Sequence, residues 1–312
     1  MADVKKIATR ESYGNALKEL AEEFPNLVVL DADLAAATKT GIFKKAYPDR
    51  HIDCGIAESN MVGIAAGLAT VGKIPFVSSF AMFAAGRAYE QVRNSVGYPH
   101  LNVKIGATHA GISVGEDGAT HQCNEDLALM RTIPGMVVMC PSDDVEARAA
   151  VRAALEYEGP VYIRFGRAAV PVINDIPDYK FEIGKGNVVR EGKDVTIVAT
   201  GICVDSALGA AKMLEADGID AEVVNICTIK PLDEELILAS AAKTGKVVTV
   251  EEHSVIGGLG SAVCDCLSAK LPTPVKKIGM QDVFGESGSA AALIEKYGLD
   301  AAGVYKSVKE WM

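Results

Sequence analysis

Short apolar runs alternate with longer mixed segments along the whole chain, and this alternation predicts strands joined by helices. Five apolar runs in the first half predict strands at 27–30, 74–79, 103–107, 136–140 and 161–165. A helix is predicted over 143–157, because Pro141 ends the strand before it and Ser142 or Asp143 can cap its first turn. Strands that alternate with helices usually pair in parallel, so the pattern indicates an α/β fold.

The second half of the chain shows the same kind of pattern after a break. Two prolines within 171–177 predict a linker. The chain then restarts with a predicted hairpin at 184–192 and a second α/β series, whose strands are expected at 194–199, 221–226, 246–250 and 275–278. A length of 312 residues suits two domains of ordinary size. We therefore predict two parallel-sheet α/β domains, 1–178 and 179–312.

The composition fits this architecture and narrows the choice of partners. Apolar residues make up 49% of the chain and aromatic residues only 6%, which favours helices packed closely on parallel sheets. A formal net charge of −10 argues against nucleic acid as a main partner. We expect a cytoplasmic protein without membrane association, because the sequence has no membrane-spanning apolar run and no signal-peptide core. Seven scattered cysteines without a Cys-x-x-Cys pair are interpreted as reduced, buried thiols, and no metal site is expected.

One carboxylate has an informative position. Glu58 follows the strand-like run 51–55 and precedes a helix rich in small residues, which include Gly63, Ala65, Ala66, Gly67 and Ala69. Small residues let another helix approach closely, so we expect a tight contact here, and an acid beside such a contact is either paired or functional. A glutamate that only caps the helix explains the position equally well, and both interpretations stay open on this segment alone.

The segment from His109 to Gln122 follows a predicted strand and holds two histidines and two acidic residues. Loops at the carboxyl ends of parallel strands are where α/β proteins place ligands, so we interpret the segment as functional. An imidazole there can hold a hydroxyl group and move its proton near neutral pH. The loop also contains a Gly-x-Ser-x-Gly pattern around Ser113, which suggests a hydrolase with His253 as base. The glycines after Ser113 disfavour the helix that a nucleophile elbow requires.

A second glycine-rich turn, Gly-Leu-Gly-Ser-Ala-Val at 258–263, follows a strand of the second half. It departs from a dinucleotide-binding fingerprint, because Val263 stands where the third glycine belongs. We interpret it as a tight turn into a helix and expect no NAD site.

These segments resemble the transketolase-like family of thiamine diphosphate enzymes. The run Gly-Ile-Ala-Glu at 55–58 is similar to the family segment whose glutamate bonds the ring nitrogen of the cofactor's aminopyrimidine. The resemblance thus implies this role for Glu58. The Ala-Asp-Leu motif around Asp33 implies that this aspartate lies near the thiazolium ring.

Aromatic residues of the first half are similar to those that wall the aminopyrimidine in the family. The resemblance assigns this role to Phe80 and Phe83 in Ser-Phe-Ala-Met-Phe. Where many relatives have a third aromatic residue, this sequence has Gly86 or Arg87. Two phenylalanines of an ordinary core are the alternative interpretation.

The loop after residue 108 closely resembles the family pattern Thr-His…Gly-Glu-Asp-Gly-x-Thr-His-Gln. In transketolases the aspartate and the second histidine of this pattern contact the hydroxyl groups of the ketose, and the first histidine lies near the sugar phosphate. The resemblance implies these roles for Asp117, His121 and His109.

Arginines complete the implied substrate site. Arg10 in Thr-Arg-Glu-Ser matches a phosphate-binding arginine of the family, and Arg164 and Arg167 both occur where a second one is expected, with Arg167 the better match. The planar guanidinium group suits this task because it binds phosphate through two parallel hydrogen bonds. With His109 counted as a further cation, these residues predict a phosphate site in an acidic protein.

The resemblance covers nearly the whole chain but only half of a transketolase. The second half is similar to the family's C-terminal domain at 229–233 and 250–253. Family members bind the diphosphate and its metal on a further domain, through Gly-Asp-Gly and a downstream asparagine, and these motifs are missing here. The resemblance therefore implies the C-terminal subunit of a split transketolase, whose separate N-terminal subunit holds the diphosphate with Mg²⁺ or Ca²⁺. We also expect self-association into a dimer and sugar phosphates as substrates.

Three other interpretations stay open. A β subunit of a thiamine diphosphate-dependent 2-oxo acid dehydrogenase shares the C-terminal motifs but lacks the loop with Asp117 and His121. A hydrolase built on Ser113 belongs to a different class. A non-catalytic paralogue is disfavoured because the sequence retains Glu58, Asp117 and His121.

Overall fold

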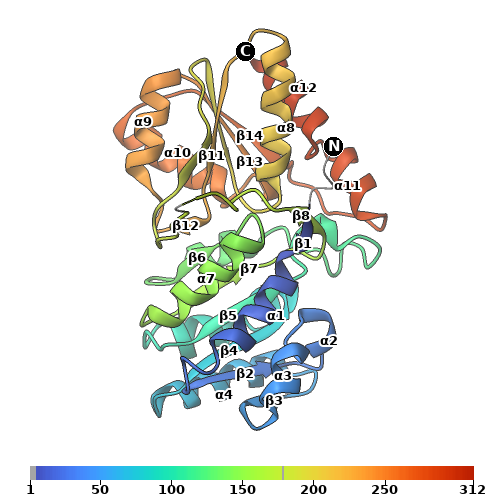
Figure 1. Cartoon of the computed structure of the whole chain (residues 1–312), viewed down its shortest axis with the longest axis vertical. Coiled ribbons are helices and arrows are strands. Elements are labelled where there is room, and N and C mark those ends of the chain that lie inside the picture. Colours follow the sequence, from blue (N-terminus) through green and yellow to red (C-terminus); the bar gives the residue numbers. More distant parts are fainter. Residues whose placement is uncertain (1–4, 178) are drawn as a thin grey trace.

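Residues 5–177 and 179–312 are described by the computed structural model, in which two α/β halves are stacked along the longest axis of the molecule (Figure 1). The first half contains a seven-stranded sheet in the order β12-β6-β7-β5-β4-β2-β3. Its neighbouring strands are parallel except β12, which pairs antiparallel with β6. The strands are β2 (Leu27–Asp31), β3 (His51–Asp53), β4 (Ile74–Phe80), β5 (Lys104–Thr108), β6 (Val137–Met139), β7 (Val161–Arg164) and β12 (Thr228–Lys230).

Helices cover both faces of this sheet because its strands are apolar on both sides. Successive strand residues point to opposite faces, so Val29 belongs to a buried cluster with residues of α1 and α7, whereas Leu30 belongs to a cluster with residues of α4. The helices of this half are α1 (Thr9–Leu20), α2 (Ala35–Thr38), α3 (Gly41–Ala46), α4 (Glu58–Thr70), α5 (Tyr89–Gln91), α6 (Asp126–Arg131) and α7 (Asp144–Glu156), with 3₁₀ turns at Pro48–Arg50 and Ile112–Val114 and π-helical turns at Met82–Arg87 and Val92–Gly97.

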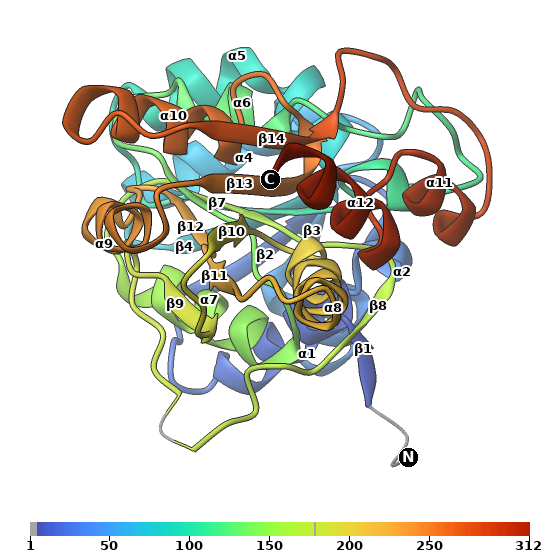
Figure 2. The same cartoon turned by 90° about the horizontal axis from the view of Figure 1, so that it is seen from above.

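The second half is a five-stranded sheet in the order β14-β13-β10-β11-β9. Helices α8 and α12 lie on one face, and α9 and α10 lie on the other (Figure 2). Its elements are β9 (Asn187–Arg190), β10 (Val195–Ala199), α8 (Cys203–Ala216), β11 (Ala221–Asn225), α9 (Glu234–Thr244), β13 (Val247–Ser254), α10 (Leu259–Lys270), β14 (Val275–Met280), α11 (Ala290–Lys296) and α12 (Ala301–Trp311).

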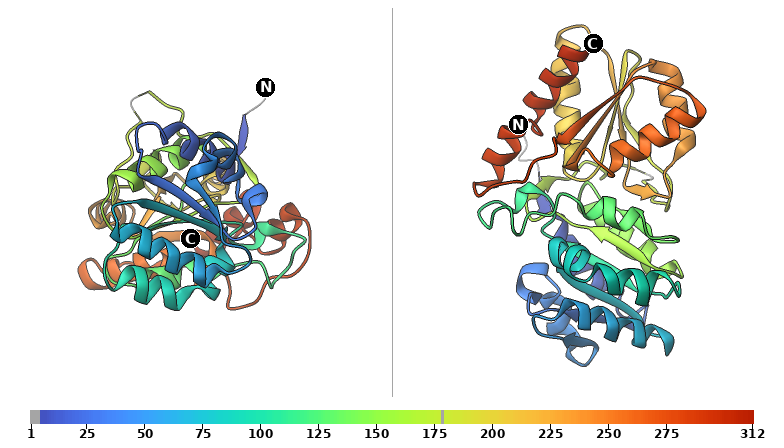
Figure 3. Two further views of the ribbon diagram at one scale, coloured as in Figure 1. Left: turned by 90° about the horizontal axis from the view of Figure 1, so that it is seen from below. Right: turned by 180° about the vertical axis from the view of Figure 1, so that it is seen from behind.

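The two halves are joined by more than their covalent connection. Strand β12 belongs to the second half in sequence but lies at the edge of the first sheet, as the view from behind also shows (Figure 3). One cluster of buried apolar residues runs from Met61 on α4 to Leu259 and Val263 on α10. A short antiparallel pair, β1 (Lys6–Ala8) with β8 (Ala169–Pro171), ties the start of the first half to its end.

The predicted α/β class is confirmed, and every strand expected from the apolar runs is present. The predicted helix over 143–157 is α7, and Asp143 caps it by accepting a hydrogen bond of 2.9 Å from the Glu146 amide. The predicted hairpin at 184–192 is wrong. This stretch supplies the single strand β9, whose antiparallel partner is β11, because the long connection from β8 brings it to that edge. Within the described ranges, no helix is long and apolar enough to cross a membrane.

Candidate functional site

The candidate residues gather where parallel strands of the first sheet end. Strands β3, β2, β4 and β5 are consecutive neighbours, and the segments that follow them carry Glu58, Asp33, Phe83 and His109. The carboxyl edge of a parallel sheet is the usual ligand site of α/β folds. The order of the strands thus brings together residues that are far apart in the sequence.

Glu58 is the first residue of α4 and is almost completely buried, with 1% of its surface exposed. Its carboxylate accepts a hydrogen bond of 3.0 Å from Arg87 Nη1, and half of the Arg87 side chain is exposed. The sequence interpretation treated Arg87 only as a missing aromatic residue and overlooked this pairing. The available signal was the expectation that a buried acid requires a partner.

Two phenylalanines and two other planar groups form a stacked column. The His109 ring lies 3.9 Å from the Phe80 ring, and the Phe80 and Phe83 rings are nearly parallel at 6.0 Å between centroids. The Arg87 guanidinium lies 4.5 Å from the centre of the Phe83 ring, where a cation is attracted by the aromatic face. The π-helical turn Met82–Arg87 positions both Phe83 and Arg87. The column therefore connects the surroundings of Glu58 to those of His109.

At the other end of the column, His109 is buried and adopts a left-handed backbone conformation with φ of 55°. Arg10 Nη1 lies 3.0 Å from His109 Nε2 and can only donate, so Nε2 is the acceptor. The proton of the neutral ring is then on Nδ1, 2.9 Å from Thr108 Oγ1. Burial, together with Arg10, Arg167 and Lys39, lowers the pKa of His109 to about 3. Burial and these three cations thus disfavour a positive charge on His109, which the sequence analysis counted as a further cation.

The two downstream arginines have different surroundings. Arg167 is partly exposed and donates to the Val114 carbonyl and, at 3.0 Å, to Glu116 Oε2. Arg164 is buried, and its Nε donates to the Asp126 carboxylate at 2.9 Å. Arg167 thus lies at the start of the histidine-containing loop, whereas Arg164 is occupied inside the protein. The surroundings of Arg167 therefore suit a phosphate ligand better than those of Arg164.

Asp33 and the nearby Asp31 differ in exposure and in hydrogen bonding. Asp33 is exposed and has a φ of 60°, and its backbone amide donates to Asp53 Oδ1 at 3.2 Å. Asp31 is buried, accepts hydrogen bonds from the Leu34 amide, Thr38 and Thr40, and has its pKa raised by burial. Asp31 therefore shapes the turn that presents Asp33.

The loop after β5 places its two predicted hydroxyl ligands at different depths. Asp117 is exposed on the loop, and His121 is half-buried, with its ring edge-on to the Phe83 ring at 5.3 Å between centroids. His121 also lies 2.9 Å from Thr120 Oγ1 through Nδ1. The imidazole is thus adjacent to the aromatic column, while the carboxylate faces solvent beside it.

The geometry does not support the hydrolase interpretation. Ser113 is buried in the 3₁₀ turn Ile112–Val114, and its hydroxyl has no hydrogen-bond partner among the described residues. The two ring nitrogens of His253 contact the Ser254 carbonyl and the Ala128 amide. The serine thus lacks the base that a nucleophile needs.

The glycine turn before α10 is filled by the protein itself. Glu251 accepts hydrogen bonds from the Leu259 and Gly260 amides at 2.7 and 2.8 Å. A Cβ atom at Gly258 would lie 2.0 Å from Glu251 Oε2. The position that a phosphate takes in a dinucleotide-binding turn is therefore occupied by a carboxylate of the chain.

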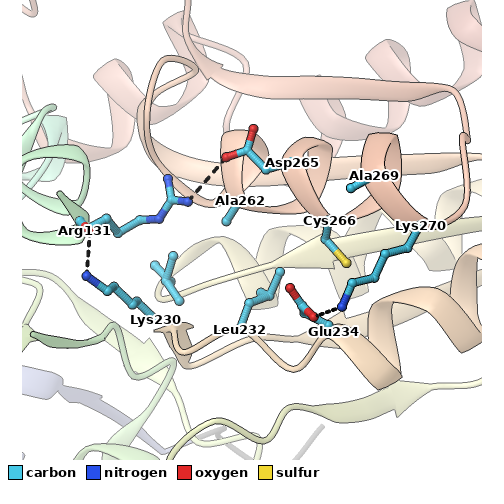
Figure 4. Close-up of a pocket in the computed structure, with 10 residues that line it drawn as sticks. Arg131, Lys230, Leu232, Glu234, Ala262, Asp265, Cys266, Ala269 and Lys270 are labelled. Atoms are coloured by element: carbon cyan, nitrogen blue, oxygen red, sulfur yellow. Dashed lines mark hydrogen bonds and ion pairs between the residues drawn. The ribbon is translucent and has the colours of Figure 1, made fainter. Parts of the chain in front are cut away.

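A separate hollow lies between α6, β12, α9 and α10 (Figure 4). Its cations are already paired: Arg131 contacts Asp265, Lys270 contacts Glu234, and Lys230 donates to the Arg131 and Ile133 carbonyls. We assign no ligand to it. Across residues 5–177 and 179–312, no group of three or more histidine, cysteine or acidic side chains is arranged to hold a metal ion.

Two family profiles match most of the chain. The profile described as transketolase, pyrimidine binding domain, matches residues 5–172, and the profile described as transketolase, C-terminal domain, matches residues 184–304. Residues 173–183 lie between the two matches.

Several similar proteins have about the same length as this chain. A candidate transketolase C-terminal section of Methanocaldococcus jannaschii is 52% identical over 97% of this chain and 96% of its own. A 6-deoxy-6-sulfo-D-fructose transketolase subunit of a Clostridium species is 48% identical over 96% of this chain and 93% of its own. The solved structure of a split gene transketolase, an inactive β4 tetramer, is 58% identical with a TM-score of 0.89 and covers 98% of both chains.

Proposed function

The chain belongs to the transketolase family, and we propose that it is the C-terminal subunit of a split transketolase that transfers a two-carbon ketol unit from a ketose phosphate to an aldose phosphate. The observation that carries the proposal is the continuous line of contacts from Glu58, through the stacked column, to Arg10. Relatives named as a C-terminal section and as a subunit, each of about this length, support the division into two chains.

The residues of the column fit the aminopyrimidine end of thiamine diphosphate, on which the family depends. Arg87 presents a flat N–H donor to Glu58 while lying over the Phe83 ring. A flat heterocycle with a ring N–H can make the same two contacts, so the cradle suits it. When bound, thiamine diphosphate supplies the carbanion that carries the ketol unit. Glu58 would hold the proton at the ring nitrogen, and Phe80 and Phe83 would orient the ring, with Asp33 beside the thiazolium.

The substrate would lie between the column and the arginines. Asp117 and His121 would hold the hydroxyl groups of the ketose. An unprotonated ring nitrogen of an imidazole can accept a hydroxyl proton and later return it. Arg10 and Arg167 would bind the anionic end of the sugar through charge-assisted hydrogen bonds. Because Arg10 Nη1 lies 3.0 Å from His109 Nε2 and the surroundings lower the pKa of this histidine to about 3, the proposed role of His109 is to accept from Arg10 and fix the direction of that guanidinium.

Helix α4 supports the proposal that another subunit completes the site. Gly63 and Gly67 are exposed, and a Cβ atom at either position would meet nothing within 4 Å. Val71 and Ile56, at either end of the helix, are 72% and 76% exposed. This apolar, small-residue face suits packing against another helix. The proposed partners are a second copy of the chain and an N-terminal subunit that holds the diphosphate with Mg²⁺ or Ca²⁺.

Reconstitution tests the proposal. The purified chain should form a homo-oligomer without ketol transfer, and adding the N-terminal subunit with thiamine diphosphate and Mg²⁺ should restore transfer in an assembly with equal numbers of both chains. Native mass spectrometry measures the assembly, and a coupled assay measures the transfer. Transfer at a normal rate by a chain shown to be free of partner would contradict the split-enzyme proposal.

A further inference from the structure

The loop from Ala110 to Asn124, which carries Asp117 and His121, is held by the second half of the chain. Three separate parts of the loop make hydrogen bonds or close contacts with it. They are the start of the loop near Ser113, its tip near Gly118, and its end near Asn124.

The start of the loop is fixed by Glu252, a buried residue of β13. The Glu252 carboxylate accepts a hydrogen bond of 2.6 Å from the Ser113 amide. Gly111 has a φ of 75°, and a Cβ atom there would lie 2.3 Å from Glu252 Cδ. The left-handed conformation and the close approach both require glycine at this position. Glu252 and Gly111 are therefore matched to each other across the two halves.

The end of the loop is fixed by the same strand. The Ser254 amide donates to the Asn124 carbonyl at 2.7 Å. Arg164 Nη2 joins the two sides, because it donates to the Glu252 carbonyl at 2.7 Å and to the Cys123 carbonyl at 3.3 Å. Its Nη1 lies 3.9 Å from the Glu252 carboxylate. The buried arginine that does not fit a phosphate site thus has a structural task at the base of this loop.

The tip of the loop lies against the segment between β14 and α11. Gln122 Nε2 donates to the Glu286 carbonyl at 2.8 Å. A Cβ atom at Gly118 would lie 2.5 Å from Ser287 Oγ, and one at Gly115 would lie 3.3 Å from the Gly288 carbonyl oxygen. Both glycines have a positive φ, of 74° and 86°. The tip therefore follows a path that brings its glycines into close contact with the second half.

We propose that the second half sets the shape of the substrate loop, and that Glu252 is a positioning residue for recognition of the ketose. This inference rests on the proposed function for the role of Asp117 and His121, but the contacts themselves do not. A loop with three glycines at positive φ has many alternative conformations. The hydrogen bonds that link the loop to Glu252 and Arg164 stabilise one of these conformations before substrate binds. The C-terminal half then has a direct part in specificity in addition to assembly.

Hydrogen exchange of the purified full-length chain tests whether Glu252 holds the loop in place, without any catalytic assay. Glu252→Ala removes the acceptor of the Ser113 amide, so exchange in peptides spanning 110–124 should become about tenfold faster, which corresponds to the loss of one ordinary hydrogen bond. Glu252→Gln keeps one acceptor oxygen and should give a smaller acceleration. Glu251→Gln is the matched control, because this neighbouring buried acid binds the start of α10 instead. It should accelerate exchange at 259–260 and leave 110–124 unchanged.

Kinetics of the assembled enzyme test the consequence. Glu252→Ala should raise the KM for the donor ketose about tenfold or more, because small misplacements of binding groups are costly, while the affinity for thiamine diphosphate stays unchanged. Glu252→Gln should restore most of the donor KM. The inference is overturned if exchange in 110–124 is unchanged in Glu252→Ala or, should that variant not fold, in Glu252→Gln. It is also overturned if Glu251→Gln accelerates the loop equally. An assembled wild-type enzyme without ketol transfer would instead contradict the proposed function, and the exchange contrast would still decide whether Glu252 holds the loop.

Discussion

Two glycine-containing turns of this protein are each fitted around a glutamate, and the two glutamates are neighbours on β13. Glu251 accepts from the amides that start α10, whereas Glu252 accepts from the Ser113 amide of the other half. Successive residues of a strand point to opposite faces, so one strand serves both turns. A Cβ atom at Gly258 would clash with Glu251, and one at Gly111 would clash with Glu252.

The two turns differ in whether their polar groups are already hydrogen-bonded within the protein. Glu251 occupies the anion position of its turn, so the amides at the start of α10 are already satisfied by the chain. Glu252 contacts its loop from the buried side. The polar side chains of that loop differ from it, because Asp117 is exposed and His121 is half-buried. A glycine-rich turn after a parallel strand is therefore a ligand site only where the protein leaves its polar groups unoccupied.

The largest effect is expected at Glu58, beside the carboxyl ends of the parallel strands of the first sheet. Glu58→Gln should reduce turnover of the assembled enzyme by about 10²–10⁴-fold, because an amide cannot exchange a proton with the cofactor ring. The fold should persist, since glutamine has the same size. Steady-state turnover at saturating substrate measures the loss, with Glu90→Gln, an exposed acid of α5, as control. Wild-type turnover in a correctly assembled Glu58→Gln enzyme would remove Glu58 from the chemistry.

A smaller effect is expected at the arginines. Arg167→Ala should raise the KM for phosphorylated donors by roughly tenfold to a hundredfold, because a charge-assisted hydrogen bond contributes about 1.5–3 kcal/mol. The KM for unphosphorylated sugars should change much less. Comparing each phosphorylated donor with its unphosphorylated counterpart measures this difference. An equal change for both kinds of sugar would show that Arg167 does not bind the phosphate.

The sequence predicted those features that depend on local patterns. The strands followed from apolar runs, and the cap of α7 was narrowed to Ser142 or Asp143, because both features rest on neighbouring residues. The hairpin at 184–192 failed because only the distant strand β11 decides how β9 pairs. In the same way, the resemblance named Arg164 as a candidate phosphate ligand, and no local pattern reveals its partners Asp126 and Glu252, which are 38 and 88 residues away. The lowered pKa of His109 depends on burial and on three distant cations, which no local pattern reveals.

The turn before α10, whose amides donate to Glu251, offers a test in which stability should change and catalysis should not. Glu251→Gln replaces one of two acceptor oxygens by an amide group that faces an N–H donor, so about 1–3 kcal/mol of stability should be lost. Chemical unfolding of the purified chain measures the loss. The KM and kcat of the assembled enzyme should stay at wild-type values. A changed KM with unchanged stability would place a ligand in this turn and remove the contrast with the loop after β5.

The smallest expected effect concerns His109, the buried imidazole beside Arg10. The folded-state pKa of His109 is lowered to about 3, whereas an unfolded chain binds this proton near pH 6.5. Between these values the unfolded state holds more protons, so the stability supplied by the neutral ring is present above about pH 6.5 and declines as the pH falls, by up to about 1.4 kcal/mol per pH unit. Wild type should therefore lose stability faster than His109→Gln when chemical unfolding is compared at pH 7, 6 and 5. Parallel stability curves for the two proteins would mean that His109 takes up its proton in the folded state, and Arg10 would then have to point elsewhere.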